Sequence, residues 1–421
     1  MNTINLTNKL NHFFLLCALF IIFLNPYFAG PLSIISGQIF ILCFIAFFFF
    51  KIYILEKSTF FINYKFLITV LILIIYPNMI SFVTGTQVDL GMINMNINVL
   101  AMIIFGFSIM HTFKNLQEST KLPLYLCKFF TTVIVLNSVI VLTEFYFPPF
   151  RVLLESLLIP DGRVDYTNGF RFRGFASAGG ASLSVAHGIS IALMYYLFRK
   201  NCFGPFRLLL SVTIVFISLI FIGRTGFVVA FIGVFLVAIL TKPSQEKAKL
   251  LSKAWVYIIL IGCISLLSYA TVFFNSLPAF YQNYSINVFL GGAESLKSEG
   301  TITTVINFFS FPDNIWQILF GIGNMSGGYE DGMPADPGLM KILTGYGVLG
   351  LLLYPGILLW CFSLPKGYLR DILIIVSILL VCTEFKEPFI LKGYTSRFFW
   401  LLIGLTAYHR GLFAVRRLVK L

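Results

Sequence analysis

The chain has 421 residues, of which 58% are hydrophobic, 17% aromatic and only 11% charged, and its mean hydropathy is +0.91. Soluble domains carry about 25% charged residues, so this composition excludes an ordinary soluble enzyme, a disordered chain and a nucleic-acid-binding protein. It is typical of an integral membrane protein. The net charge of +13 is then best explained by topology, because Lys and Arg collect on the cytoplasmic side of membrane proteins.

Long stretches without charge predict the membrane-spanning helices, because about 20 apolar residues cross the hydrocarbon core of a bilayer. The first such stretch, 10–50, is too long for one helix and is divided by Gly30-Pro31. In chain order the predicted spans are 13–29, 32–50, 66–84, 94–112, 126–146, 182–198, 208–223, 226–241, 255–274, 338–362, 369–384 and 395–409. The expected fold is an all-α polytopic membrane protein of about 12 transmembrane helices, forming one domain over residues 1–421.

The connections between the predicted spans indicate the orientation. With twelve spans they alternate between the two sides, and the side that holds both termini carries 20 of the 30 Lys and Arg residues. The positive-inside rule therefore places both termini in the cytoplasm. The segment 25–29 lacks a small residue three positions before a possible cleavage site, so the first span is expected to be a retained anchor. None of the 7 Cys falls in a predicted outer loop, so no disulfide is expected, and their spacing does not resemble a metal site.

Two of the predicted outer loops are long, 147–181 and 275–337, whereas most connections are short. Long outer loops on a helical membrane domain favour a function at that face. The first loop contains Arg163, Arg171 and Arg173, on the side that should be poor in Arg. A guanidinium group binds phosphate oxygens at two points, so the cluster predicts a phosphate or pyrophosphate site at the membrane surface. For any single Arg, the alternative is contact with lipid headgroups or with acidic side chains of the same loop.

A tight outer turn, Gly223-Arg224-Thr225-Gly226, joins two predicted spans. The turn is so short that Arg224 must lie at the edge of the membrane, close to the helices. One interpretation is a side chain that extends toward the headgroups as an anchor. The other is a functional site, which is the default hypothesis for an ionisable residue at that depth. His187, inside a predicted span, is more typical of a helix–helix contact than of a catalyst.

The second long loop contains no Arg, and its one basic residue is Lys297. Near its end lie Tyr329, Asp331 and Asp336, directly before the span that is predicted to begin at 338. Acidic residues at this position suit the positive end of a helix, so helix capping alone explains Asp336. The same carboxylates could instead supply a general base for a sugar hydroxyl. Both interpretations stay open on the residues alone.

Taken together, these features resemble the O-antigen polymerases (Wzy-type), within the superfamily of polymerases and ligases for bacterial surface polysaccharide. The layout of spans, with a large outer loop before the tenth, is similar to that family. So are the turn around Arg224 and the segment Phe320-Gly321-Ile322-Gly323. A third similarity is Asp336 followed by Tyr346-Gly347 and Gly350. The match covers the second half of the chain, and the first five spans add little beyond hydrophobicity.

The resemblance implies a GT-C-like membrane glycosyltransferase of the bacterial inner membrane. Such an enzyme moves a growing glycan from undecaprenyl pyrophosphate to a lipid-linked repeat unit outside the cytoplasm. It implies Arg224, Asp336 and Asp331 as catalytic residues, with Arg224 as the pyrophosphate binder. It implies substrate-binding roles for a second group of residues, namely Arg163, Arg171, Arg173, Lys297 and Tyr329. No nucleotide sugar is involved, so neither a metal nor another cofactor is expected. The expected partners are the lipid-linked oligosaccharide, membrane lipid and a chain-length regulator protein, and no nucleic acid.

Two departures from the family matter. The family usually places an Arg early in the large loop, where this chain has Lys297, a point charge rather than a planar fork. The sister ligases typically carry a His in that loop, and its absence here favours a polymerase over a ligase. A different class of alternative is a lipid-linked oligosaccharide flippase or another transporter. Transporters often show charged residues at mid-membrane depth, whereas the polar residues here collect at the outer surface.

Overall fold

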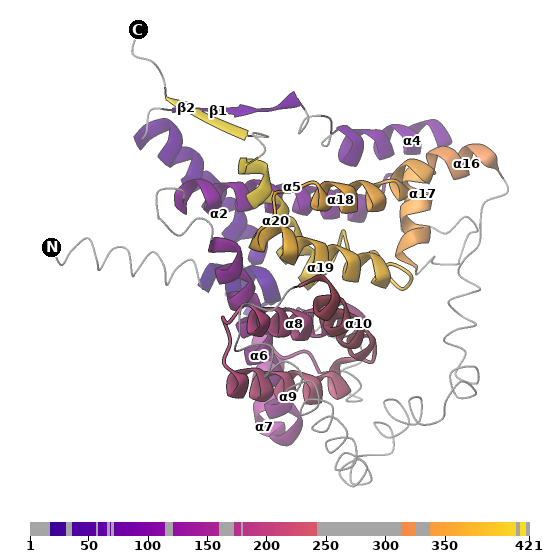
Figure 1. Ribbon diagram of the computed structural model, residues 1–421. Helices are drawn as coiled ribbons and strands as arrows, with labels where there is room; N and C mark the ends of the chain where they lie inside the picture. The colour runs from indigo at the N-terminus through magenta and orange to yellow at the C-terminus, as the bar shows by residue number, and fades with distance from the viewer. Residues whose placement is uncertain are drawn as a thin grey trace. The chain divides into compact units, whose positions relative to one another are not determined.

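The computed structural model describes residues 17–30, 36–55, 58–64, 68, 71–113, 121–159, 172–177, 180–241, 314–325, 337–409 and 413–417. These parts of the chain are predominantly helical (Figure 1). They divide into two compact units, which are described separately below. Unit 1 comprises 1–129 and 307–421, and unit 2 comprises 130–306.

Five helical segments are long and apolar enough to cross a membrane, or six if one bent pair counts as a single span. The five are Gly37–Ile54, Leu90–His111, Leu122–Tyr146, Ala181–Arg199 and Pro205–Ile222. The chain thus has the helices of a membrane protein. The number of twelve spans, the orientation of the termini and the GT-C-like architecture stay predictions. The predicted span 255–274 lies outside the described residues.

Unit 1 is built around two helices, α5 (Leu90–Phe113) and α20 (Tyr394–His409), which lie side by side (Figure 1). The other elements in chain order are α2 (Gly37–Phe50), the π-helix η2 (Lys51–Leu55), β1 (Ser58–Ile62), the π-helix η3 (Leu71–Ile75), α4 (Tyr76–Thr84), α16 (Ile315–Phe320), α17 (Gly338–Leu351), α18 (Leu353–Phe362), α19 (Tyr368–Thr383) and β2 (Phe413–Arg417). β1 and β2 pair antiparallel, with Ser58 opposite Arg417 and Ile62 opposite Phe413.

One predicted span, 338–362, is broken in the structure. α17 and α18 meet at a bend of 52°. The sequence supplies a physical reason, because Pro355 has no N–H to donate and its ring would clash with the carbonyl of Leu351 in a continuous helix. Gly347 adds a second irregularity inside α17, with φ of 66° and ψ of −160°.

The described residues of unit 2 comprise most of α6 (Leu122–Tyr146) and four further helices. These are α7 (Pro148–Leu157), α8 (Ala181–Arg199), α9 (Pro205–Ile222) and α10 (Thr225–Leu240). α8 is the core helix of the unit, since every residue from Leu183 to Leu197 is buried. α8 and α10 pack closely against each other (Figure 1). Glycine allows this approach, because a Cβ at Gly188 would overlap the carbonyl oxygen of Gly226.

The first predicted outer loop, 147–181, opens with a helix rather than an irregular segment. α7 begins with Pro148 and Pro149, which suit the first turn because the N–H groups there have no partner inside the helix. Arg151 and Glu155 then form an i,i+4 ion pair, with Nε and Oε1 2.8 Å apart.

The α5–α20 contact yields a stability prediction. A Cβ added to Gly404 would overlap the carbonyl oxygen of Ile103, and one added to Gly106 would overlap that of Leu401. Gly404→Leu is therefore expected to lower the free energy of unfolding by at least about 1–3 kcal/mol, the usual cost of overpacking. Thermal unfolding of the detergent-solubilised protein measures this. Gly204→Leu, at a glycine with open space around it, is the control. Equal melting temperatures for the two variants would contradict the close packing.

Candidate functional site

In unit 2, Arg173 is buried, with 5% of its surface exposed. Its Nη1 donates to the carbonyl oxygens of Ile159 and Ser177, each at 2.9 Å, and its Nη2 lies 3.5 Å from that of Leu158. The guanidinium therefore holds the segment after α7 to the segment before α8. This geometry supports a structural role for Arg173, and its predicted role in substrate binding stays a prediction.

Polar side chains from α6 hold the segment around Gly174. Glu144 accepts a hydrogen bond from the Gly174 N–H at 2.8 Å, and Asn137 Oδ1 accepts one from the Phe175 N–H at 2.9 Å. Asn137 Nδ2 in turn donates to the carbonyl oxygen of Arg173 at 3.2 Å. Gly174 has φ of +61°, and a Cβ there would overlap Asn137 Oδ1. Only glycine fits this position without strain or overlap.

The turn around Arg224 connects α9 and α10 as expected. Arg224 is half-buried and stands directly before the first residue of α10. The glycines on either side allow close packing, because Cβ atoms at Gly223 and Gly226 would both meet Ser184 on α8. The backbone of the turn is therefore fixed against the core helix of unit 2, which presents Arg224 at the end of the helical hairpin.

His187, also on α8, is fully buried. Its Nδ1 forms a hydrogen bond with the carbonyl oxygen of Leu183 at 2.8 Å, and Nε2 has no hydrogen-bond partner among the described residues. This local bond, one turn back along the same helix, supports the interpretation of His187 as a structural residue.

In unit 1, the structure brings together two of the sequence motifs, Phe320–Gly323 and Tyr346–Gly350. The Ile322 N–H donates to the carbonyl oxygen of Thr344 at 2.6 Å, and a Cβ on Gly321 would lie 2.7 Å from the Gly347 nitrogen. Gly321 and Gly347 have φ of +75° and +66°. The two motifs are thus in backbone contact, and both glycines are needed for it.

The same segment also docks onto α4. Ser81 Oγ donates to the carbonyl oxygen of Gly323 at 2.8 Å, and Thr86 Oγ1 donates to that of Ile322 at 2.7 Å. Asp89 Oδ2 accepts a hydrogen bond from the Met325 N–H at 3.0 Å. Side chains at the end of α4 and the start of α5 therefore satisfy the backbone of an irregular segment, as an apolar environment requires.

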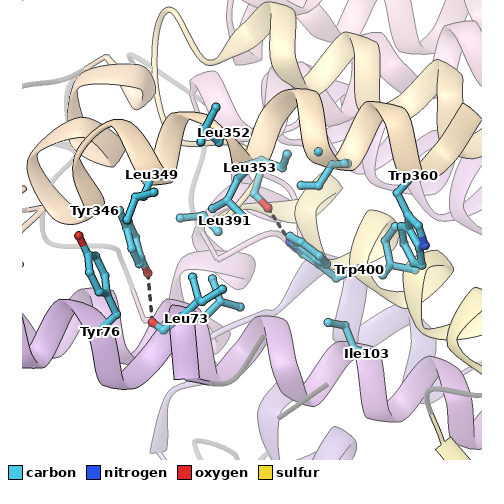
Figure 2. A pocket seen from close by; sticks show the side chains of 16 residues that line it. Leu73, Tyr76, Ile103, Tyr346, Leu349, Leu352, Leu353, Trp360, Leu391 and Trp400 are labelled. Carbon is cyan, nitrogen blue, oxygen red and sulfur yellow. Dashed lines mark hydrogen bonds between the residues drawn. The ribbon is translucent and has the colours of Figure 1, made fainter. Parts of the chain in front are cut away.

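Next to these motifs lies an apolar cavity of about 640 Å³ (Figure 2). Tyr76 and Tyr346 lie at one end, and Trp360 and Trp400 lie toward the other. The remaining lining is almost wholly aliphatic, with Leu73, Leu349, Leu353 and Leu391 as examples. Its volume is in the range of sites that bind small molecules, and its lining suits a hydrocarbon chain.

Hydrogen bonds fix two of the aromatic residues of this cavity, Tyr346 and Trp400. Tyr346 Oη donates to the carbonyl oxygen of Leu73 at 3.2 Å and accepts from Asn96 Nδ2 at 2.6 Å. Trp400 Nε1 donates to the carbonyl oxygen of Ile390 at 2.6 Å (Figure 2). This part of the wall is therefore preorganised, because the polar ends of Tyr346 and Trp400 already have partners.

A buried carboxyl, Glu384, connects the start of α17 to its neighbours. Its exposure is 0%, and it accepts hydrogen bonds from Tyr354 Oη at 2.7 Å and from the Ile390 N–H at 2.6 Å. Its backbone carbonyl accepts from the Leu339 N–H at 3.2 Å. A Cβ on Gly338 would overlap the Glu384 carboxylate. Glu384 thus fixes the helix end that directly follows the predicted catalytic Asp336.

Several predicted site residues lie outside the described residues, namely Arg163, Arg171, Lys297, Tyr329, Asp331 and Asp336. Their roles stay predictions. Within the described residues, no group of three or more His, Cys, Asp or Glu is placed to hold a metal ion.

Sequence reasoning missed the residues that organise these regions, above all Glu144 and Glu384. A signal for both was present, because each is a single carboxyl within or at the end of a long apolar stretch. Asn96 and Asn137 gave only a weak signal, since polar uncharged side chains are tolerated in many membrane helices.

Comparisons with protein-family models, with curated proteins and with solved structures found no match to this chain. Its function must therefore be argued from its own residues and their geometry.

The contacts of Glu384 yield a second prediction. Glu384→Ala removes the acceptor of two buried donors, so we expect the free energy of unfolding to fall by about 1–3 kcal/mol per donor left without a partner. Thermal unfolding in detergent measures the effect. Tyr354→Phe removes only one of the two hydrogen bonds to Glu384, so it should lower the free energy of unfolding by less. Glu155→Ala, at an exposed pair on α7, is the control. Unchanged stability of Glu384→Ala would contradict the role given to this carboxyl.

Proposed function

We propose that this protein is a bacterial surface-polysaccharide polymerase that transfers a growing glycan from undecaprenyl pyrophosphate onto a lipid-linked repeat unit. The observation that carries the proposal is the backbone contact between the segments Phe320–Gly323 and Tyr346–Gly350 beside an apolar cavity. Both segments are similar to motifs of O-antigen polymerases. Their joint position next to a cavity suited to a hydrocarbon chain supports a site for a lipid-linked substrate.

The chemistry that we propose needs few groups. An acceptor hydroxyl attacks the anomeric carbon of the donor glycan, the new glycosidic bond forms, and the bond to the pyrophosphate oxygen breaks. The leaving group is already a weak base, so a protonating acid is dispensable. The main requirement is stabilisation of the charge that develops on the pyrophosphate, which a guanidinium can provide.

Arg224 is our candidate for that cation, because the packing of Gly223 and Gly226 against α8 fixes the backbone that carries it. Asp336 or Asp331 is the candidate base that takes the proton of the acceptor hydroxyl. Arg163, Arg171 and Lys297 are the candidates for further contacts with the phosphates or sugars, and Tyr329 is a candidate for stacking on a sugar.

The deciding experiment is a gel of surface polysaccharide from a strain of the source bacterium that lacks this gene. Lipid A core with a single repeat unit is the expected result for a polymerase. Bare core with finished chains left on the carrier would instead indicate a ligase. Bare core with repeat units held in the cytoplasm would indicate a flippase.

Complementation of that strain tests Arg224. We expect Arg224→Ala to abolish the ladder of long chains and to leave core plus one unit, because the charge on the leaving group is no longer stabilised. Arg207→Ala is a matched control, since Arg207 and Arg224 lie at opposite ends of α9. A normal ladder from Arg224→Ala, at normal protein level, would remove Arg224 from the mechanism.

The same assay tests Asp336. If this carboxylate orients or deprotonates the acceptor, Asp336→Asn should shorten or abolish the ladder. Loss of a general base is expected to lower the rate of polymerisation by about 100-fold or more. Asp371→Asn, in the first turn of α19, controls for loss of a carboxylate near a helix start. Wild-type chain lengths with Asp336→Asn would leave helix capping as the role of Asp336.

A further inference from the structure

A second, smaller cavity lies beside the apolar one in unit 1. Its volume is about 100 Å³, and the two cavities share the side chains of Leu391 and Trp400. A buried water needs about 10–15 Å³ of such space, so this cavity has room for a group the size of several waters. Its polar lining comes from two parts of the chain: Asn98 lies on α5, whereas Lys392 lies just before α20 and Ser396 and Arg397 lie in its first turn.

The lining of the small cavity is cationic, since Lys392 and Arg397 line it and, among the described residues, no acidic side chain does. Arg397 Nη1 donates to the carbonyl oxygen of Ile22 at 2.7 Å. This is its one hydrogen bond within the part of the chain that the structure describes, and a guanidinium has five N–H donors, so others can bind an anion. Lys392 Nζ lies 3.3 Å from Glu387 Oε2, and both side chains are about one-third exposed. Such a pair contributes little to stability, so an incoming anion can compete with Glu387 for Lys392.

The segment that carries Lys392 is held in place. Ile390 donates through its N–H to Glu384 at 2.6 Å, and its carbonyl oxygen accepts from Ser396 Oγ at 3.0 Å and from Trp400 Nε1 at 2.6 Å. Gly393 follows with φ of +100°, a conformation that favours glycine. The cationic cavity is therefore built on a fixed segment, and this segment also forms part of the wall of the apolar cavity.

We infer that Lys392, Arg397 and Asn98 bind the phosphate group of a polyprenyl phosphate or pyrophosphate, whose isoprenoid chain fills the adjoining apolar cavity. A cationic pocket and an apolar cavity with common walls match the two parts of such a lipid. The assignment of the lipid as polyprenyl rests on the proposed function. The site itself is new, because none of these three residues belongs to the sequence motifs that led to that function.

The headgroup half is tested by binding of fluorescent farnesyl pyrophosphate to the purified full-length protein in detergent. Lys392→Gln should weaken binding at least about tenfold, the usual effect of losing a hydrogen bond to a charged group. Arg397→Lys keeps the charge but loses the planar fork, so a smaller loss is expected. Lys386→Gln is the matched control, since Lys386 is exposed in the same segment and does not line the cavity. Wild-type affinity in Lys392→Gln would overturn the assignment.

The chain half is tested by filling the apolar cavity. Gly356 lines it, and a Cβ there meets nothing within 4 Å, so Gly356→Leu places a side chain in the cavity without a clash in the protein. We expect this variant to weaken the binding of farnesyl pyrophosphate and of farnesol alike, whereas Lys392→Gln should weaken the binding of farnesyl pyrophosphate only. Gly367→Leu, at a glycine with open space outside the cavity, is the control. Unchanged affinity for both ligands in Gly356→Leu would overturn the assignment of the chain.

Competition distinguishes the polyprenyl ligand from membrane phospholipid. Phosphatidylglycerol should displace farnesyl pyrophosphate only at much higher concentration, and equal competition would overturn the inference in favour of a general lipid site.

The outcome is separable from that of the deletion strain. A ligase or flippase phenotype with intact binding would reject the polymerase and keep the site. If the deletion strain has a polymerase phenotype but neither Lys392→Gln nor Gly356→Leu changes the binding affinity, the site is rejected and the polymerase proposal stands.

Discussion

The contact between Gly321 and Gly347 constrains the whole candidate site of unit 1. It brings two irregular backbone stretches so close that a Cβ on either glycine would overlap the other segment. Irregular backbone among apolar helices must have its N–H and C=O groups satisfied by nearby protein. Ser81, Thr86 and Asp89 provide those partners, while Thr344 provides a backbone acceptor. The glycines permit the approach, and the polar side chains on α4 and near the start of α5 stabilise it.

The bend between α17 and α18 and the apolar cavity belong together. A straight helix over 338–362 would continue along one axis, whereas the break near Pro355 turns α18 by 52° relative to α17. Leu349 before the bend and Leu353 and Trp360 after it all line the cavity (Figure 2). Tyr354 faces elsewhere and donates to Glu384, which holds the start of α17. The same bent pair thus forms a wall of the cavity and fixes the helix end that follows Asp336.

The sequence predicted the positions of the five long apolar helices, because long apolar stretches leave a chain no other way to satisfy its backbone in a bilayer, but it did not predict α7, α16 or the break within 338–362. It also singled out the motifs at 320–323 and 346–350, which lie in contact. The contact itself could not be predicted, since it depends on backbone angles that glycine permits but does not dictate. Charge counting only divided the Lys and Arg residues between the two sides, and it gave no reason to single out Lys392 and Arg397.

Arg173 and Arg397 show why a count of Arg residues cannot identify a binding site. Both donate to backbone carbonyls, so neither has a typical surface environment. Around Arg173, three carbonyl groups from two chain segments accept from the guanidinium, and the side chain is almost wholly buried. Arg397 donates to one such carbonyl and lines a cavity. Backbone carbonyl groups surround the guanidinium of Arg173, whereas a cavity lies beside that of Arg397. That difference arises from where the backbone supplies acceptors, a property of the fold that residue type and spacing do not encode.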